Sequence, residues 1–268
     1  MDKDNDKEFF RYKYLPFGQD KLSLNVIKEG TIKFTCPKDF NDPFDCQPVV
    51  DTDNLPEMEA FKRAFSEKSK GMSFLDKKLL KDKMLIDFRR SIKSGDMISY
   101  FLDTVGVLSL SRQYDNALMW SHYAEYHRGF VVGFKYKKPD DLKETDMDIR
   151  KIIPREVKYA KEKPIYAPSS NEFDMSVLLT KDDVWKYEAE ERAFTWLEQP
   201  GVHPYDRAKR LHCVIAGAKI SKDDLALLRN AVQQASKELG RKIKFKQARL
   251  SEKTYDLEFV DIKYKYKK

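Results

Sequence analysis

The chain has 268 residues, of which 41% are hydrophobic and 13% aromatic, enough for a real core in one large domain or two small ones. Its 51 lysines and arginines exceed its 44 aspartates and glutamates, so the net charge of +7 allows an anionic partner such as nucleic acid or a nucleotide. Apart from a basic C-terminal tail, we expect this excess to be spread along the chain.

Cysteine content and apolar runs exclude two further classes. The three cysteines, Cys36, Cys46 and Cys213, have no framework spacing, which argues against a secreted disulfide scaffold. The charged N-terminus contains no apolar signal segment, and no stretch approaches the ~20 apolar residues of a membrane span. We therefore expect a cytoplasmic protein without a membrane partner.

The beginning of the chain predicts short strands. Aromatic residues alternate with basic ones over residues 10–14, which is typical of a strand. A short helix over residues 22–27 then leads to Gly30, a suitable residue after a helix end. Residues 31–35 alternate again and end at a turn rich in proline and aspartate.

Two helices are expected next. Met58, Phe61 and Phe65 fall on one face of a helix over residues 57–70. An apolar residue recurs every four positions over residues 74–93, which predicts a second, core-facing helix. Together they form a helical insertion at about 55–95 that could cap a site.

The rest of the chain alternates between apolar strands and short helices. Strands are expected at 105–111, 129–134, 188–197 and 211–217, and a short helix at 115–127. Ser221 is a suitable N-cap for a further amphipathic helix that Gly240 closes. One α+β domain over residues 1–268, with the helical insertion, is the simplest account.

The run WKYEAEER at residues 185–192 carries the strongest chemical signal. If it is extended, Glu188, Glu190 and Arg192 point one way, because strand side chains alternate. One carboxylate can then be neutralised by the arginine, while the other is held ready to abstract a proton or stabilise a developing cation. The alternative is a helical surface run in which Glu188 and Arg192 form an i, i+4 pair.

A second motif, LSLSRQYDNALMWSHYAEYHRGFVVGF, combines serines with aromatic residues. Ser109 and Ser111 share a strand face, and Trp120, His122 and Tyr123 follow on a helix. This arrangement suits a flat ring such as nicotinamide or adenine, with the serines meeting its polar edges. The alternative is ordinary aromatic core.

A third motif, NDPFD, predicts a rigid turn. Asn41 and Asp42 can accept hydrogen bonds from nearby backbone N–H groups, and the proline between them and Asp45 fixes the backbone. Such a turn either lines the rim of a ligand pocket or only orients two strands. The histidines and cysteines lack any metal-ligand spacing, so no metal site is expected.

Taken together, these blocks resemble a bacterial family whose function is unknown. The matching blocks are YKY near the N-terminus, FNDPFD, LSLS…ALMWSHYAEYHRGFVVGF, LLTKDDVWKYEAEER and VIAGAKIS. They occur in the same order and cover the chain from about Tyr12 to about Ser221. Glu191 departs from the family, which has a large apolar or aromatic residue there.

The layout of the blocks also resembles the ADP-ribosyltransferases, including the DarT-type enzymes that modify nucleic acid. The resemblance implies an α+β fold with two packed sheets around a cleft, and NAD as substrate. The basic residue on the early strand would be Arg11 or Lys13, contacting the diphosphate. The serine and tyrosine segment would hold the nicotinamide side, and Glu190 or Glu188 would be the late-strand glutamate.

The resemblance therefore implies an NAD-dependent ADP-ribosyltransferase, a toxin or phage-defence effector with RNA, DNA or protein as acceptor and a cognate antitoxin as partner. Two alternatives stay open: a non-catalytic module that binds nucleic acid or a nucleotide, and a hydrolase of NAD or of a phosphodiester. If the chain is an enzyme, we expect the serines, Tyr123 and Glu190 to line one cleft, with the NDPFD turn at its rim.

Overall fold

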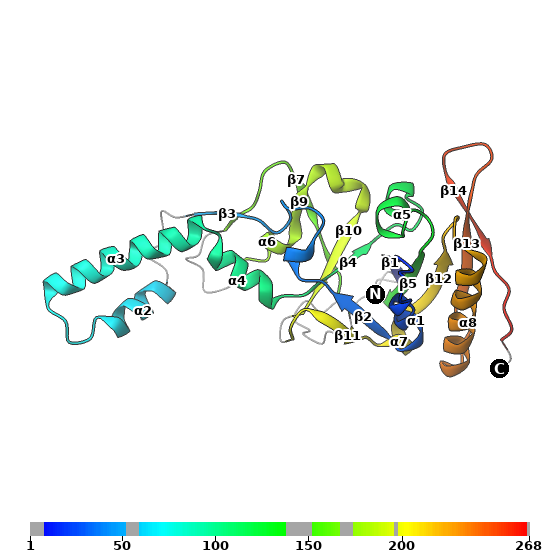
Figure 1. Ribbon diagram of the computed structural model, residues 1–268, viewed down its shortest axis with the longest axis horizontal. Coiled ribbons are helices and arrows are strands. Elements are labelled where there is room, and N and C mark those ends of the chain that lie inside the picture. The colour runs from blue at the N-terminus through cyan, green and yellow to red at the C-terminus, as the bar shows by residue number, and fades with distance from the viewer. Residues whose placement is uncertain (1–7, 52–58, 138–151, 167–173, 196–197, 267–268) are drawn as a thin grey trace, which may run out of the picture. The chain divides into compact units, whose positions relative to one another are not determined.

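The structure, a computed structural model, describes residues 8–51, 59–137, 152–166, 174–195 and 198–266 (Figure 1). The chain divides into two compact units. Unit 1 comprises Met1–Thr35, Val107–Glu156 and Lys186–Lys268, and unit 2 comprises Cys36–Gly106 and Val157–Trp185. The fold is α+β as expected, with the inserted helices in unit 2.

Unit 1 is built on an eight-stranded sheet whose order is β14-β13-β12-β5-β1-β4-β10-β6. Its strands are β1 (Glu8–Leu15), β4 (Val107–Ser111), β5 (Phe130–Lys137), β6 (Arg155–Glu156), β10 (Glu190–Phe194), β12 (Leu211–Ala216), β13 (Lys244–Leu250) and β14 (Leu257–Asp261). All neighbouring pairs described are antiparallel except β12 and β13, which makes the sheet mixed. A second, two-stranded sheet pairs β2 (Thr31–Phe34) with β11 (Gly201–Pro204).

Helices cover both faces of the large sheet. The longest is α8 (Lys222–Glu238), whose buried residues join β5 and β12 in one hydrophobic core. On the other face, α5 (Ala117–Tyr123) packs Met119 and Trp120 against residues of β1, β5 and β12. Short helical turns at η1 (Leu22–Leu24), α1 (Asn25–Lys28) and α7 (Arg207–Arg210) complete the unit.

The expectation of two packed sheets is not met among the described residues, which form one eight-stranded sheet and three two-stranded ones. The reason lies in the central strands. Residues 130–134 and 213–216 are buried on both faces of the sheet, and helices supply the covering layers that a second sheet would have supplied.

Unit 2 holds the inserted helices α2 (Glu59–Lys68), α3 (Phe74–Lys93) and α4 (Asp96–Thr104). Its remaining elements are η2 (Pro37–Asp39), β3 (Val49–Val50), β7 (Lys158–Ala160), β8 (Ile165–Tyr166), α6 (Ser176–Leu179) and β9 (Thr180–Asp182). The 3-10 helix η5 (Asp183–Glu188) runs across the border between the units. The expected helix over 74–93 is confirmed at both ends. At its N-terminus, Ser73 caps the helix by accepting a hydrogen bond from the Asp76 N–H.

A left-handed turn follows α5 and leads into β5. Glu125, Tyr126 and His127 all have positive φ, between 51° and 70°, a conformation that residues other than glycine seldom adopt. The turn is fixed from outside by the Glu125 carboxylate, which accepts hydrogen bonds from the backbone N–H groups of Phe17 and Gly18. It therefore joins the end of α5 to the segment after β1.

No helix among the residues that the structure describes is both long enough and apolar enough to span a membrane.

Candidate functional site

Two of the three motifs meet near the start of β10, because β4 pairs with this strand and Tyr123 donates to Glu188. Glu188 ends η5, Ala189 has a positive φ of 44°, and the strand begins at Glu190. Glu188 is therefore not on the strand, which corrects the expectation that it would share a strand face with Glu190 and Arg192. The left-handed backbone at Ala189 turns the chain between the two glutamates.

Main-chain contacts hold this turn in place. The buried Ser111 hydroxyl donates to the Glu188 carbonyl at 2.7 Å, and the Arg112 N–H donates to the Ala189 carbonyl at 3.0 Å. From the start of α5, Asn116 accepts hydrogen bonds from two N–H groups of the helix and donates through Nδ2 to the Tyr187 carbonyl at 3.1 Å. Asn116 therefore caps α5 and also ties the helix to η5.

Glu190 and Arg192 form a buried ion pair. Arg192 Nε donates to Glu190 Oε1 at 2.8 Å, and Nη2 donates to Oε2 at 3.1 Å. Register places Glu190 opposite Ser111 and Arg192 opposite Ser109, so all four lie on the sheet face that α5 covers. The expected neutralisation of one carboxylate by Arg192 is confirmed in its geometry, and Glu190 is the carboxylate concerned.

Glu188 has a different environment. Its carboxylate is buried, and its Oε1 accepts a hydrogen bond from the Tyr123 hydroxyl at 2.5 Å. Next to this pair, the Tyr187 hydroxyl lies 3.1 Å from Nδ1 of the exposed His122. Glu188 thus accepts a hydrogen bond from a neutral hydroxyl, and Glu190 accepts two from a guanidinium.

Lys13, beside Tyr12 on β1, is a basic residue within electrostatic range of both glutamates. It is half-buried, and no hydrogen bond or ion pair of its ammonium group is found among the described residues. Burial lowers the pKa of Lys13 to about 8, an effect that the charges of Glu190 and Glu188 oppose and that of Lys33 assists. Among the described residues, β1 pairs with β4 through Tyr12 and Ser111 alone, so the two strands separate at Lys13.

A titration tests this environment of Lys13. Its amine should lose its proton near pH 8 and react with acylating reagents about two pH units earlier than exposed lysines, whose pKa is about 10.4. Replacing Glu188 by glutamine should lower the pKa of Lys13 further, because a negative charge that favours the ammonium form is removed. NMR of the ¹³C-methylated lysines measures both values, and a Lys13 midpoint above pH 10 would contradict the prediction.

Arg11, the other basic candidate of β1, is already paired. Its Nε and Nη2 donate to the two carboxylate oxygens of Glu191 at 2.5 and 2.6 Å. The residue that departs from the resembled family therefore has a partner 180 positions earlier in the chain. This bidentate pair gives Arg11 a structural role, and Lys13 is the basic residue of β1 whose pKa the charges of Glu190 and Glu188 raise.

The serine and aromatic candidates separate into two groups. Trp120 is 0% exposed and donates from Nε1 to the Tyr114 carbonyl, so its ring belongs to the core and cannot stack a ligand. Ser111 is fully used by main-chain groups, since its oxygen also accepts from the Gln113 N–H. Ser109 is half-buried, and Tyr123 and His122 reach the surface.

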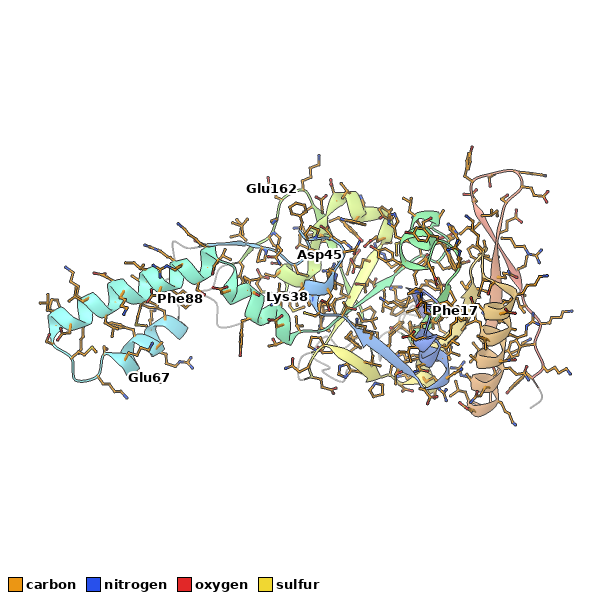
Figure 2. The ribbon with its side chains drawn as sticks, in the orientation of Figure 1. Phe17, Lys38, Asp45, Glu67, Phe88 and Glu162 are labelled. Carbon is orange, nitrogen blue, oxygen red and sulfur yellow. The ribbon has the colours of Figure 1, made fainter. Side chains whose placement is uncertain are left out.

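The NDPFD turn lies in unit 2. Asp42 accepts a hydrogen bond from the Phe44 N–H, which confirms the expected Asx-type turn, and Asn41 is exposed. Asp45 is buried, with its Oδ2 3.7 Å from Nζ of the equally buried Lys181 (Asp45 is labelled in Figure 2). A place for this turn at the rim of a pocket remains a prediction.

The left-handed turn after α5 is the main feature that sequence reasoning missed here. Its His127 lies 3.1 Å from the Ser121 hydroxyl through Nε2 and stacks on Trp120, with the two rings inclined by 11°. Burial lowers the pKa of His127, and its Nδ1 is buried without a hydrogen-bond partner among the described residues. The only signal was the glycine two residues later, at 129. No group of three or more potential metal ligands occurs in the described parts of the chain.

Comparison with known proteins gives a family match over part of the chain and no activity. Residues 119–193 match the family described as "Protein of unknown function (DUF2971)". The match runs from α5 to β10 and so contains Tyr123, Glu188, Glu190 and Arg192. No curated protein and no solved structure matches the chain.

Proposed function

We propose that unit 1 transfers ADP-ribose from NAD to an acceptor, and that the acceptor is a nucleic acid. The observation that carries the proposal is Glu188, a buried carboxylate that accepts a hydrogen bond from the Tyr123 hydroxyl and whose charge affects the pKa of Lys13. A carboxylate in such a place can stabilise an oxocarbenium-like centre. A toxin or phage-defence role would follow from the resemblance to DarT-type enzymes.

Of the two glutamates, Glu188 is the better catalytic candidate. Both oxygens of Glu190 accept hydrogen bonds from Arg192. The guanidinium stabilises the negative charge, but it also occupies the oxygens that would otherwise face a substrate. The Tyr123 hydroxyl that donates to Oε1 of Glu188 is neutral, so a ribose hydroxyl can take its place without leaving a buried charge unpaired. Glu190 and Arg192 are then positioning residues that fix the start of β10.

In the proposed reaction, one bond at C1′ of the ribose breaks and one forms. The bond between C1′ of the ribose and the nicotinamide nitrogen breaks, and nicotinamide leaves with the electron pair. The Glu188 carboxylate faces the cationic ribose, and the Lys13 ammonium contacts the diphosphate, since Arg11 is already occupied by Glu191. The acceptor oxygen or nitrogen bonds to C1′ and gives its proton to Glu188.

The experiment measures nicotinamide release from NAD by the full chain, with and without DNA and RNA. Glu188→Gln should lower the rate by about 10²–10³-fold, because the substitution removes the charge and keeps the shape. Glu252→Gln changes an exposed glutamate of unit 1 in the same way and should leave the rate unchanged. Full activity of Glu188→Gln would exclude the carboxylate mechanism.

A non-catalytic binding module is the second candidate. Two bidentate ion pairs, Arg11 with Glu191 and Arg192 with Glu190, neutralise side chains that could otherwise bind a substrate or take part in catalysis. For such a module, calorimetry would detect NAD or nucleic acid binding while nicotinamide release stays at the background rate in both the unmodified chain and Glu188→Gln.

A further inference from the structure

The α2–α3 hairpin of unit 2 is held together by an aromatic cluster. The rings of Phe61 and Phe65 stack with centroids 6.5 Å apart, and Phe61 meets the edge of Phe88 at 6.3 Å. Ile92 extends the cluster along the same side of α3. Figure 2 shows Phe88 on the side of α3 that faces α2.

The net charge of the chain is concentrated in this hairpin. Residues 59–93 contain eleven lysines and arginines against five aspartates and glutamates, an excess of six out of the +7 of the whole chain. All eleven are exposed: Lys62, Arg63, Lys68, Lys70, Lys77, Lys78, Lys81, Lys83, Arg89, Arg90 and Lys93. The expectation that the excess is spread along the chain is therefore wrong.

A second apolar row runs along α3, on the side away from α2. Leu75, Leu79 and Ile86 are 66%, 62% and 58% exposed. Their spacing of four and seven residues places them on one helical face, opposite the face that carries Phe88. Because these three side chains are so exposed, no other described element of the structure covers the row.

Basic residues flank this row on both sides. Helical spacing puts Lys78 and Arg89 along one edge of the row and Lys83 and Arg90 along the other. Asp82 lies within the row, between the leucines and the isoleucine. The exposed face of α3 is thus an apolar strip with one acid, bordered by Lys78 and Arg89 on one edge and by Lys83 and Arg90 on the other, where Arg90 also lies 3.8 Å from the Asp87 carboxylate.

The charges decide which partner fits this face. A second copy of the helix would bring like charges together, which disfavours pairing of two hairpins. An anionic bilayer would have to bury the Asp82 carboxylate with the aliphatic row, at a substantial cost. A duplex presents phosphates to both edges at once and polar base edges to the centre.

We propose that α3 docks in the major groove of double-stranded DNA. A helix is about 10–12 Å wide with its side chains and the B-form major groove is about 12 Å wide, so the basic edges meet phosphates of both strands. The aliphatic row then contacts thymine methyl groups, and the Asp82 carboxylate accepts from a cytosine amino group. The major groove of A-form RNA is too narrow for this contact.

This inference goes beyond the proposed transfer reaction and is tested without NAD, so the two can fail separately. Fluorescence anisotropy of a labelled 20-base-pair DNA duplex, titrated with the full chain, should show affinity that falls steeply with salt. Each phosphate contact contributes about −0.9 to the slope of log K against log salt concentration. A flat salt dependence would overturn the proposal.

Paired charge reversals locate the contact. Lys83→Glu with Arg90→Glu should weaken duplex binding by about tenfold or more near 0.1 M salt and reduce the slope. Lys222→Glu with Arg229→Glu makes the same change in charge on exposed residues of α8 in unit 1 and should have a much smaller effect. An equal loss in both variants would mean that the net charge, and not α3, attracts DNA.

The aliphatic row gives a separate readout. Leu79→Ser should weaken duplex binding severalfold while leaving the salt slope unchanged, because it removes no cation. Equal affinity for duplex RNA, or binding to vesicles of anionic phospholipid with no binding to DNA, would overturn the groove assignment. Circular dichroism of each variant establishes that the hairpin is still folded.

Discussion

Arg192→Met should destabilise unit 1 by about 3–5 kcal/mol, because it removes the cation that neutralises a buried carboxylate. Arg192 is fully buried, and Glu190 is nearly so. Without its partner, Glu190 must either keep an uncompensated charge or take up a proton. Urea unfolding followed by circular dichroism measures the change in the free energy of unfolding.

A double variant shows how much of this loss of stability comes from the unpaired charge of Glu190 and how much from the loss of the arginine side chain. Glu190→Gln with Arg192→Met removes both charges and should recover a large part of the lost stability. Arg229→Met, on an exposed position of α8, should change the stability by no more than about 0.5 kcal/mol. A cost below about 1 kcal/mol for Arg192→Met would contradict the prediction, because it would mean that water compensates the charge of Glu190.

Gly217→Ala should prevent unit 1 from folding normally. A Cβ atom at Gly217 would lie 2.1 Å from the carbonyl oxygen of His127, and one at Gly129 would lie 2.1 Å from that of Leu15. Both obstacles are main-chain atoms, which a rotamer change cannot move away. We expect a loss of more than about 4 kcal/mol for either substitution, seen as loss of soluble protein or of a cooperative thermal transition.

A third glycine provides the control. Gly240 has a positive φ of 62° but nothing within 4 Å of its would-be Cβ atom. Gly240→Ala should therefore cost only about 1 kcal/mol, the price of the left-handed backbone alone. Similar melting temperatures for Gly240→Ala and Gly217→Ala would show that the main chain around His127 can move aside.

The parts of the fold that the sequence predicted are those decided by nearby residues. The helix over 74–93 follows from its spacing, and α8 begins after the expected N-cap Ser221, which accepts a hydrogen bond from the Asp224 N–H. These signals act within one or two helical turns, so a single sequence contains them in full. The α+β class follows from their order.

The features that were missed depend on distant residues or on the backbone. Nothing local indicates that Arg11 would pair with Glu191, because the two meet only when the sheet is assembled. The run WKYEAEER alternates well enough for a strand throughout, and the positive φ at Ala189 that removes Glu188 from it leaves no mark in the sequence. Trp120 resembled a stacking residue because aromatic side chains suit cores and ligands equally well.

The place of β1 in the sheet has a consequence for synthesis of the protein on the ribosome. β1 pairs with β5 from Leu15 opposite Phe130 to Glu8 opposite Lys137, so its main partner is made more than a hundred residues later. At the usual pace of translation, the nascent chain carries this aromatic segment unpaired for on the order of ten seconds. Arg11 and Lys13 interrupt its apolar run, and charges in such positions oppose aggregation of an exposed strand. The cation that later pairs with Glu191, together with Lys13, therefore protects the emerging polypeptide before the rest of the sheet exists.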